Sequence, residues 1–213
     1  METIKYGLAL HTTTPELGLA MSNFVGETHS HVWELGRELS SQIHEYLIKF
    51  IQPQNWADLG FIAVAKGPGG FTGTRIGVVT ARTLGQQLDI PVFAISTLAA
   101  VALSEKGKKV IDKNKHIAVQ MPAQRSQVFG AIYQHVTDNS GLTALLPDTV
   151  FTPEKWQETL ANWQTSYELI EAKSGLAATV TSVLELAYFD WEQGKRPDWS
   201  EALPYYGQHP VDL

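Results

Sequence analysis

The sequence predicts an α/β protein made of two lobes. Short apolar runs of strand length alternate with longer segments in which apolar residues recur every three or four positions, as in an amphipathic helix. Strands precede helices twice along the 213 residues. Between the two series, the stretch 106–115 holds five lysines and one aspartate, which is typical of a solvated connection. We therefore predict an N-terminal lobe over 1–105 and a C-terminal lobe over 106–213.

The first lobe is expected to begin with three strands joined by short turns. The apolar runs at 6–10 and 17–21 are separated by the turn-prone residues 11–15, and a third strand is predicted over 24–31. A helix is predicted from 33 to 51, because its apolar residues recur at three- and four-residue steps. These residues are Leu35, Leu39, Ile43, Tyr46, Leu47 and Phe50.

The middle of the first lobe reads as a buried strand, a glycine loop and a helix. The continuous apolar run at 61–65 suits a strand buried on both faces. A helix is predicted over 72–88, and another strand over 91–95, after which Ser96 or Thr97 can cap the next helix. The predicted structural loop between strand and helix consists of Gly67, Pro68, Gly69 and Gly70.

The second lobe is expected to contain four strands and two helices. The predicted strands are 116–121, 128–133, a weak one near 149–150, and 167–170. Thr152 is the predicted N-cap of a helix, with Pro153 at its first position. Apolar spacing predicts another helix over 176–191 and an irregular segment after it.

Composition excludes several classes of protein. The chain has 44% hydrophobic residues, which is enough for a core, so wholesale disorder is excluded. It has no cysteine, so disulfides and thiolate chemistry are excluded. No leader and no apolar run of about 18 residues is visible, so we predict a cytoplasmic protein without a membrane span. The net charge of −6 disfavours RNA binding over the whole surface, although the 106–115 stretch leaves a local RNA-facing patch open.

The motifs of common catalytic sites are missing from the sequence. None of the seven histidines forms the i, i+4 pair that binds metals on a helix, and His29 and His31 lack an obvious third ligand. The nucleophile elbow G-x-S-x-G is not present either. We therefore predict no metal site, no cofactor and no catalytic residues.

The glycine loop allows two interpretations. A loop between a buried strand and a helix can hold a phosphate on its backbone N–H groups. However, a P-loop needs Lys and Ser or Thr after its last glycine, and here Thr74 and Arg75 follow Gly73. The dinucleotide spacing also fails, because Thr72 stands where its last glycine should be. A tight structural turn is the favoured interpretation.

The helix after this loop carries a stripe of small residues. Gly73, Gly77, Ala81 and Gly85 are four residues apart and share one face. Glycine destabilises a helix interior by about 1 kcal/mol relative to alanine, so a close neighbour should offset the loss. That neighbour is either part of the same lobe or a helix of a second subunit, and the spacing alone favours neither.

Residues 67–77, GPGGFTGTRIG, resemble the signature G-P-G-S-F-T-G-x-R-I-G of the TsaB (YeaZ) family. Residues 94–98, AISTL, resemble its G-V-S-T-L segment, and residues 204–206, PYY, its closing P-x-Y. Residues 8–13 stand where the family has A-I-D-T followed by Ala or Ser. The order and spacing of these segments agree along nearly the whole chain.

This resemblance implies a two-lobed actin-like fold (ASKHA, ribonuclease H-like) and a role in tRNA modification. The family supplies a non-catalytic subunit to TsaD, which carries the metal-binding H-x-x-x-H. TsaD places a threonylcarbamoyl group on adenosine 37 of tRNAs that read codons starting with A. The implied partners are TsaD in a heterodimer, the ATPase TsaE in the larger complex, and a second copy of the chain when it is alone. tRNA is implied only as an indirect partner.

Together with the small-residue stripe, the resemblance implies an interface on the helices 33–51 and 72–88. We expect these helices to pack together and to form one side of a helical seam. The expected interface residues are Gly73, Arg75, Ile76, Gly77, Ala81, Leu35, Leu39 and Ile43.

Several positions depart from the family pattern. His11 stands where actin-like ATPases have an aspartate near the metal, which makes nucleotide hydrolysis less expected. Gly70 replaces serine, Lys66 replaces arginine, and Leu39 replaces histidine. Residues 122–124 read PAQ where the family often has D-A-R, so the second lobe is divergent.

Two other functions remain open from the sequence. The chain could be an enzyme, either a nucleotide- or carbamoyl-handling transferase or a peptidase. It could also be a self-associating structural protein outside tRNA modification. The sequence features favour the scaffold.

Overall fold

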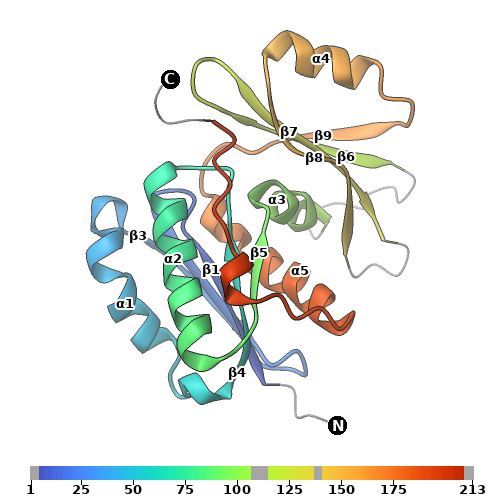
Figure 1. The fold of residues 1–213 in the computed structure, drawn as a ribbon. Helices are drawn as coiled ribbons and strands as arrows, with labels where there is room; N and C mark the ends of the chain where they lie inside the picture. Colours follow the sequence, from blue (N-terminus) through green and yellow to red (C-terminus); the bar gives the residue numbers. More distant parts are fainter. Residues whose placement is uncertain (1–4, 107–114, 137–140, 209–213) are drawn as a thin grey trace.

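A computed structural model describes residues 5–106, 115–136 and 141–208. It contains two β-sheets with helices on their faces (Figure 1). The first sheet has the strand order β3-β2-β1-β4-β5 and the second β8-β7-β6-β9. The strands are β1 (Tyr6–His11), β2 (Glu16–Ser22), β3 (Thr28–Glu34), β4 (Leu59–Ala65), β5 (Val92–Ile95), β6 (His116–Pro122), β7 (Val128–His135), β8 (Leu142–Phe151) and β9 (Tyr167–Glu171). The α-helices are α1 (Leu39–Phe50), α2 (Phe71–Leu88), α3 (Thr97–Lys106), α4 (Pro153–Ala161) and α5 (Val180–Glu192).

The first sheet is antiparallel on one side of β1 and parallel on the other. β1 pairs antiparallel with β2, with Leu10 opposite Leu19, and parallel with β4, with Leu10 beside Val64. Successive side chains of a strand point to opposite faces, so alternate residues of β1 enter different clusters. Leu8 and Leu10 belong to one cluster, whereas Ala9 lies on the opposite face.

Each face of the first sheet is covered by helices. α1 and α2 cover the face of Leu8 and Leu10, and they lie next to each other in Figure 1. α5 packs on the other face, where Val183 and Ala187 meet the cluster of Ala9. This double burial explains why the run at 59–65 reads as continuously apolar.

The second sheet is covered by α4 on one face and α3 on the other. Trp156 and Leu160 of α4 pack on Ala118 and Ile132. Leu98, Val101 and Ala102 of α3 pack on the opposite face with Ile117, Val119 and Ala131. α3 therefore lies between the two sheets (Figure 1).

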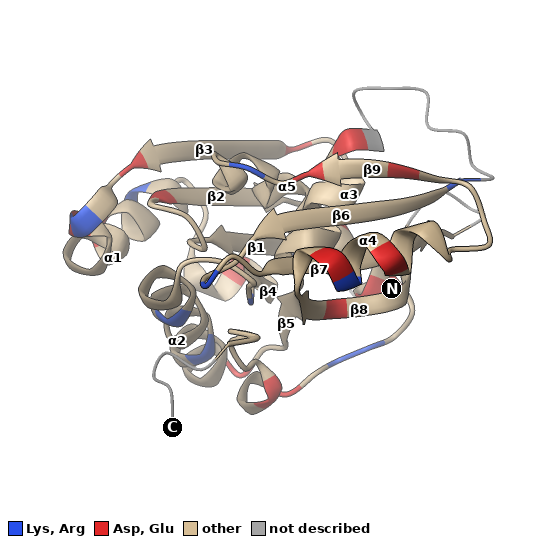
Figure 2. Ribbon diagram, turned by 90° about the horizontal axis from the view of Figure 1, so that it is seen from above, with Lys and Arg blue, Asp and Glu red and all other residues tan. Residues whose placement is uncertain are grey.

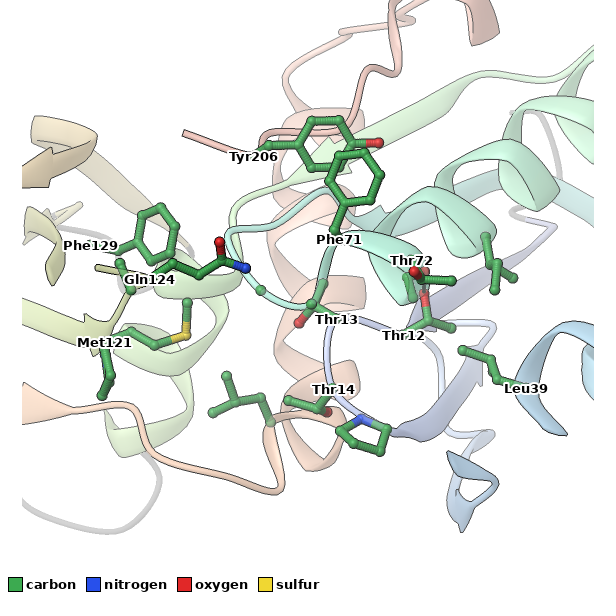
Figure 3. A pocket seen from close by; sticks show the side chains of 18 of the residues that line it. Thr12, Thr13, Thr14, Leu39, Phe71, Thr72, Met121, Gln124, Phe129 and Tyr206 are labelled. Carbon is green, nitrogen blue, oxygen red and sulfur yellow. Dashed lines mark hydrogen bonds between the residues drawn. The ribbon is translucent and has the colours of Figure 1, made fainter. Parts of the chain in front are cut away.

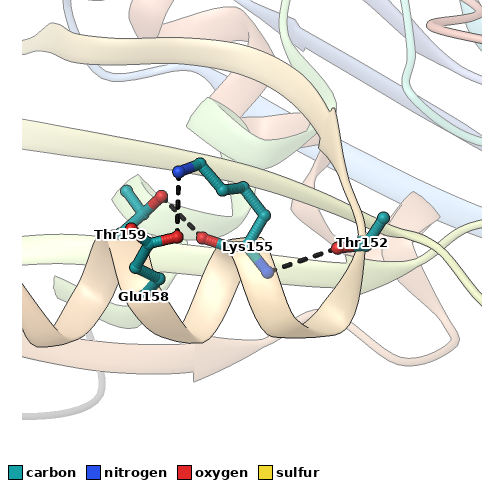
Figure 4. A network of polar contacts seen from close by, with 4 residues as sticks. All are labelled: Thr152, Lys155, Glu158 and Thr159. Carbon is teal, nitrogen blue, oxygen red and sulfur yellow. Dashed lines mark hydrogen bonds and ion pairs between the residues drawn. The ribbon is translucent and has the colours of Figure 1, made fainter.

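The start of α4 forms as the sequence predicts. The N–H of Lys155 donates to Oγ1 of Thr152 at 3.3 Å, which satisfies one free donor of the first turn (Figure 4). Lys155 Nζ also contacts Glu158 at 2.9 Å, and Thr159 Oγ1 donates to the carbonyl of Lys155. Both side chains of the ion pair are exposed, so the cap contributes more to helix formation than the pair does.

Three elements differ from the sequence predictions. β3 runs to Glu34, and α1 begins only at Leu39 after a short 3₁₀ turn over Gly36–Glu38. The weak strand predicted near 149–150 is part of the ten-residue β8, whose side chains are mostly half-buried or exposed. The segment 176–191 begins with a 3₁₀ turn, η3 (Leu176–Thr179), before α5.

The predicted division at 105/106 stays a prediction. Residues 107–114, which include most of the lysine-rich stretch, lie outside the described residues. α5 packs against the first sheet, and Ala202 belongs to its core. The 3₁₀ turn η4 (Trp199–Glu201) lies against α2. The first sheet and its covering helices thus include residues from both halves of the chain.

Candidate functional site

A cleft of about 990 Å³ opens between the two sheets. Its first-lobe wall carries Thr12, Thr13 and Thr14 at the end of β1, and its second-lobe wall carries Met121 and Gln124 (Figure 3). Both walls are formed where strands end and turns begin. In α/β folds, such strand ends are where binding sites are built.

The glycine loop packs directly on Thr12 and Thr13. A Cβ atom added to Gly69 would lie 2.5 Å from the carbonyl oxygen of Thr13. One added to Gly73 would lie 2.1 Å from the carbonyl oxygen of Thr12. Gly67 has a φ of +102°, and its Cβ would meet the carbonyl oxygen of Tyr205 at 2.3 Å. Glycine is required at these positions because any side chain would collide with backbone.

The polar groups of the loop are used inside the chain. Gly70 N–H donates to the carbonyl of Thr13 at 2.7 Å, and the carbonyl of Gly70 accepts from Thr74 Oγ1 at 2.8 Å. The carbonyl of Gly73 accepts from Thr12 Oγ1 at 2.8 Å, and that of Gly67 from the N–H of Thr97. The loop therefore fastens β1, α2 and α3 together.

The cleft has a positive balance of side chains. Among its described lining residues, Arg37 and Lys173 carry charge, and none is an aspartate or glutamate. Lys173 forms an ion pair with Glu171 at 3.0 Å, and this carboxylate partly offsets the positive charge that Lys173 brings to the cleft. The neighbouring helix α2 carries two arginines and no acidic residue over Phe71–Leu88 (Figure 2).

His11 ends β1 and is fully buried. Its two ring nitrogens have no hydrogen-bond partner within the part of the chain that the structure describes. Burial lowers the pKa of His11 to about 3, so the imidazole is neutral at pH 7. The position where actin-like ATPases carry an aspartate therefore holds an uncharged ring below the cleft.

A second polar cluster, which sequence reasoning missed, surrounds Asp148 on β8. Asp148 Oδ1 accepts hydrogen bonds from Ser96 Oγ and Tyr133 OH, both at 2.8 Å, and its carbonyl accepts from Tyr205 OH at 2.7 Å. Burial raises the pKa of Asp148, opposed by these two hydroxyls and by Lys66. Burial and the neighbouring carboxylate also hold the pKa of Tyr133 well above its ordinary value. The five residues are far apart in sequence. Lys66, Ser96 and Tyr205 lie in segments singled out from the sequence, but nothing there connects them with Asp148 or Tyr133.

The predicted interface residues divide into buried and exposed groups. Leu35, Leu39 and Ile43 lie in the core against the first sheet. Gly77 and Ala81 are also buried, and a Cβ added to Gly77 would lie 2.2 Å from Thr12 Oγ1. Gly73 and Gly77 lie against Thr12, just after β1, and Gly85 lies against Val92 and Trp199, so the chain itself fills the space beside these glycines. Pairing of a partner helix along the stripe stays a prediction. Of the eight residues, only Arg75 is exposed, while Gly73 and Ile76 are half-buried.

The outer surfaces of α1 and α2 carry different residues from those predicted. Ile48 of α1 is 55% exposed and Val79 of α2 is 53% exposed. Both are apolar side chains on the two helices that cover the same face of the sheet. They lie opposite the buried face of each helix, so sequence periodicity could have identified them.

Two further findings concern metals and membranes. Among the described residues, no group of three His, Cys, Asp or Glu side chains is placed to hold a metal ion. No helix in the described ranges is both long enough and apolar enough to cross a membrane.

Comparison with known families identifies the chain. The family model described as TsaD, tRNA N6-adenosine threonylcarbamoyltransferase, matches residues 36–189, which is more than half of the chain. The chain belongs to this family. Its curated relatives include TsaB proteins of several bacteria, so the predicted resemblance to TsaB (YeaZ) is confirmed.

The TsaB relatives match parts of the chain. The tRNA threonylcarbamoyladenosine biosynthesis protein TsaB of Bacillus subtilis (strain 168) is 39% identical over 103 residues, covering 48% of this chain and 42% of the relative. The TsaB of Escherichia coli (strain K12) is 26% identical over 167 residues, covering 74% of this chain and 69% of the relative. The chain spans about half or less of the length of the first three curated relatives that it matches.

The fold is that of YeaZ. The solved structure of YeaZ from Pseudomonas aeruginosa superposes with a TM-score of 0.76 at 22% sequence identity, covering 95% of this chain and 99% of that one. A second structure from the same organism, described as similar to peptidase YEAZ, gives a TM-score of 0.77. This likeness confirms the predicted two-lobed actin-like fold.

Proposed function

We propose that this chain is a non-catalytic scaffold subunit that supports a TsaD protein in threonylcarbamoyladenosine synthesis on tRNA. The observation that carries the proposal is the internal use of the glycine loop. Its carbonyls and the Gly70 N–H bind Thr13, Thr12, Thr74 and Thr97 of the same chain. These bonds hold the lobe together, and the Gly70 N–H that they use is not free to bind a phosphate.

The end of β1 supports the same interpretation. The carboxylate that the resemblance leads one to expect at position 11 is replaced by a histidine that is buried and neutral. A neutral, fully buried imidazole lacks the negative charge that attracts a divalent cation. Position 11 therefore lacks the carboxylate oxygen that Mg²⁺ prefers as a ligand.

The partner surface that we propose is the outer face of α1 and α2, defined by Ile48, Val79 and Arg75. The two apolar side chains are exposed, and Arg75, one turn before Val79 on α2, can form charge-assisted hydrogen bonds. Interface centres are rich in apolar side chains and arginine. TsaD is the proposed partner on this face, a second copy covers it when the chain is alone, and TsaE joins the larger complex. tRNA contacts the assembly mainly through the other subunits.

Charge placement on this face tests the proposal. We expect Ile48→Lys with Val79→Lys to weaken pairing with the TsaD of the same organism by roughly tenfold or more, because each 1.4 kcal/mol is a factor of ten. Both positions are exposed, so the melting temperature should hardly change. Sedimentation with TsaD measures the pairing, and formation of threonylcarbamoyladenosine by the complete complex measures the function.

Val25→Lys is the matched control. Val25 is 75% exposed and lies in the turn between β2 and β3, away from α1 and α2. Its replacement should leave pairing intact. If the double variant pairs as well as the parent chain, the proposed face is wrong.

The non-catalytic part of the proposal has its own test. Calorimetric titration of the isolated chain with ATP and Mg²⁺ should show no tight, stoichiometric binding, and the chain alone should show no ATP hydrolysis above a matched blank. Tight binding or turnover would favour the alternative, a nucleotide- or carbamoyl-handling transferase that uses the 990 Å³ cleft.

A further inference from the structure

The segment 203–208 connects the two lobes along the edge of the cleft. Just before it, the chain is anchored to the first lobe: Ala202 is buried in the core of the first sheet, and Trp199 lies against Gly85 of α2. Just after it starts, the backbone N–H of Tyr205 donates to the carbonyl of Lys66 at 2.7 Å. Its first half is therefore fixed to the first lobe.

The second half of this segment is fixed to the second lobe. The Gln208 side chain is held by the turn between β6 and β7, because its Nε2 donates to the carbonyl of Gln124 and its Oε1 accepts from the N–H of Gln124, both at 3.1 Å. The same Nε2 contacts the Gln127 side chain. Gly207 sits against Phe129 with a φ of +63°. Two hydrogen bonds to one side-chain amide fix both the position and the orientation of Gln208.

Two consecutive tyrosines of the segment have different surroundings. Tyr205 OH donates to the carbonyl of Asp148, inside the polar cluster with Ser96 and Tyr133. Tyr206 lines the cleft and its ring stacks on Phe71 with centroids 4.2 Å apart (Figure 3). Consecutive side chains of an extended segment point to opposite sides. Tyr205 thus bonds to a residue at the junction of the lobes, and Tyr206 borders the cleft.

We propose that residues 203–208 form a strap that sets the spacing of the two lobes and thereby the opening of the cleft. The strap has three attachment points: Lys66 in the first lobe, Asp148 at the junction, and Gln124 in the second lobe. Each is a small number of hydrogen bonds between parts that each have their own core. Another connection is α3, which has residues in the core clusters of both lobes. Release of the strap's bonds should therefore change the spacing of the lobes about α3 without unfolding either of them, as in hinge motion.

Gly67 of the glycine loop lets the strap lie close to the first lobe. The carbonyl oxygen of Tyr205 occupies the place where a Cβ of residue 67 would lie. A substitution at Gly67 would displace the strap as well as strain the backbone, so that position is a poor test. Variants of the strap's own side chains are cleaner, because they remove hydrogen bonds and leave the loop unchanged.

The experiment measures the distance between the lobes directly. The chain has no cysteine, so His44→Cys on α1 and Gln157→Cys on α4 introduce the only two attachment points for spin labels, and neither position lines the cleft. Both positions are exposed and lie on helices of different lobes. We expect the doubly labelled parent to give one narrow distance distribution. Gln208→Ala and Tyr205→Phe should each broaden it and shift it to other distances.

Gln164→Ala is the matched control. Gln164 is also exposed, and its amide donates to the carbonyl of Asn162, far from the strap. The distance distribution of the labelled Gln164→Ala variant should match that of the labelled parent. Tyr205→Phe removes one oxygen atom and keeps the ring, so it carries the test even if Gln208→Ala folds poorly.

Unchanged distributions in both strap variants would overturn the proposal. An equal change in Gln164→Ala would overturn it as well, since the lobes would then respond to any surface change. The measurement uses the chain alone, so its outcome is independent of whether the chain is a scaffold for TsaD.

Discussion

On one face of the first sheet, two neighbouring helices pack in different ways. α1 contacts the sheet through the large side chains of Leu39, Ile43 and Leu47. α2 contributes Val78 and Ala81 to the same core, and its glycines Gly73 and Gly77 lie against Thr12 in the turn after β1. Large side chains keep a helix axis at the usual distance, whereas glycine lets backbone approach backbone.

This difference shows what the small stripe is for. Because α2 lies so close, Thr12 Oγ1 reaches the carbonyl of Gly73, and the carbonyl of Thr13 reaches the N–H of Gly70. These two hydrogen bonds build the first-lobe wall of the cleft. α1 contributes Leu39 and Ser40 to the lining of the cleft. Close approach at α2 therefore serves the chain's own cleft.

Truncating a large side chain of α1 should have the greatest effect. Ile43 is 1% exposed, and Ile43→Ala should lower the free energy of unfolding by about 2–5 kcal/mol through lost burial and a cavity. For a chain of this length that is roughly 4–20 °C in melting temperature. His44→Ala, on the exposed side of the same helix, is the control and should change little. A melt of Ile43→Ala equal to that of the control would contradict the account of α1.

Acid should destabilise the chain through His11 at the end of β1. Its pKa is about 3 in the folded chain and 6.5 in the unfolded chain, so the unfolded state binds the proton more readily as pH falls. The contribution of the neutral His11 to the free energy of unfolding is complete above pH 6.5. It decreases toward pH 3 by about 1.4 kcal/mol per pH unit. Between pH 6.0 and 4.5 this amounts to about 2 kcal/mol.

The comparison of His11→Leu with the parent isolates this contribution. Leucine fills a similar volume without a titrating group, so urea unfolding of the variant should depend less on pH between 6.5 and 4. Other groups titrate equally in both chains. Identical pH profiles would show that His11 is not buried as a neutral ring.

Filling the stripe of α2 should have a smaller effect than the truncation in α1. Gly77→Ala places a methyl group 2.2 Å from Thr12 Oγ1, and overpacking of this kind typically lowers stability by about 1–3 kcal/mol. The better helix propensity of alanine offsets up to about 1 kcal/mol of that loss. Thermal melts of the isolated chain measure the net effect.

A second substitution sharpens this test. Thr12→Ala removes the colliding Oγ1, so Gly77→Ala should be less harmful in its presence than alone. If Gly77→Ala leaves the melt unchanged but abolishes pairing with TsaD, the stripe faces a partner after all. That outcome would reverse the interpretation of α2.

Much of the fold could be predicted because its elements have clear periods. The apolar steps of α1 predicted the residues that it buries, and the run at 61–65 predicted a strand covered on both faces, which the structure extends to Leu59–Ala65. The capped start of α4 followed from Thr152 and Pro153 alone. β8 was underestimated because its side chains are mostly half-buried or exposed, so it lacks the alternation that marks a strand.

The candidate site was less predictable from the sequence. The glycine signature correctly marked a special loop, but it did not show that the loop's neighbours are Thr12, Thr13 and Tyr205. Asp148 gave no signal, since its partners lie 52, 15 and 57 residues away. Polar clusters built from such distant residues depend on how the sheets are placed.

The sequence by itself determined the order of strands and helices, the buried face of each helix, the need for glycine in the loop, and the family. Only the tertiary structure decided what occupies the space beside the small residues of α2, and that α5 returns to the first sheet. The physical reason is that periodicity specifies which residues share a face of an element. It does not specify which other element will cover that face, because that depends on contacts between residues far apart in the chain.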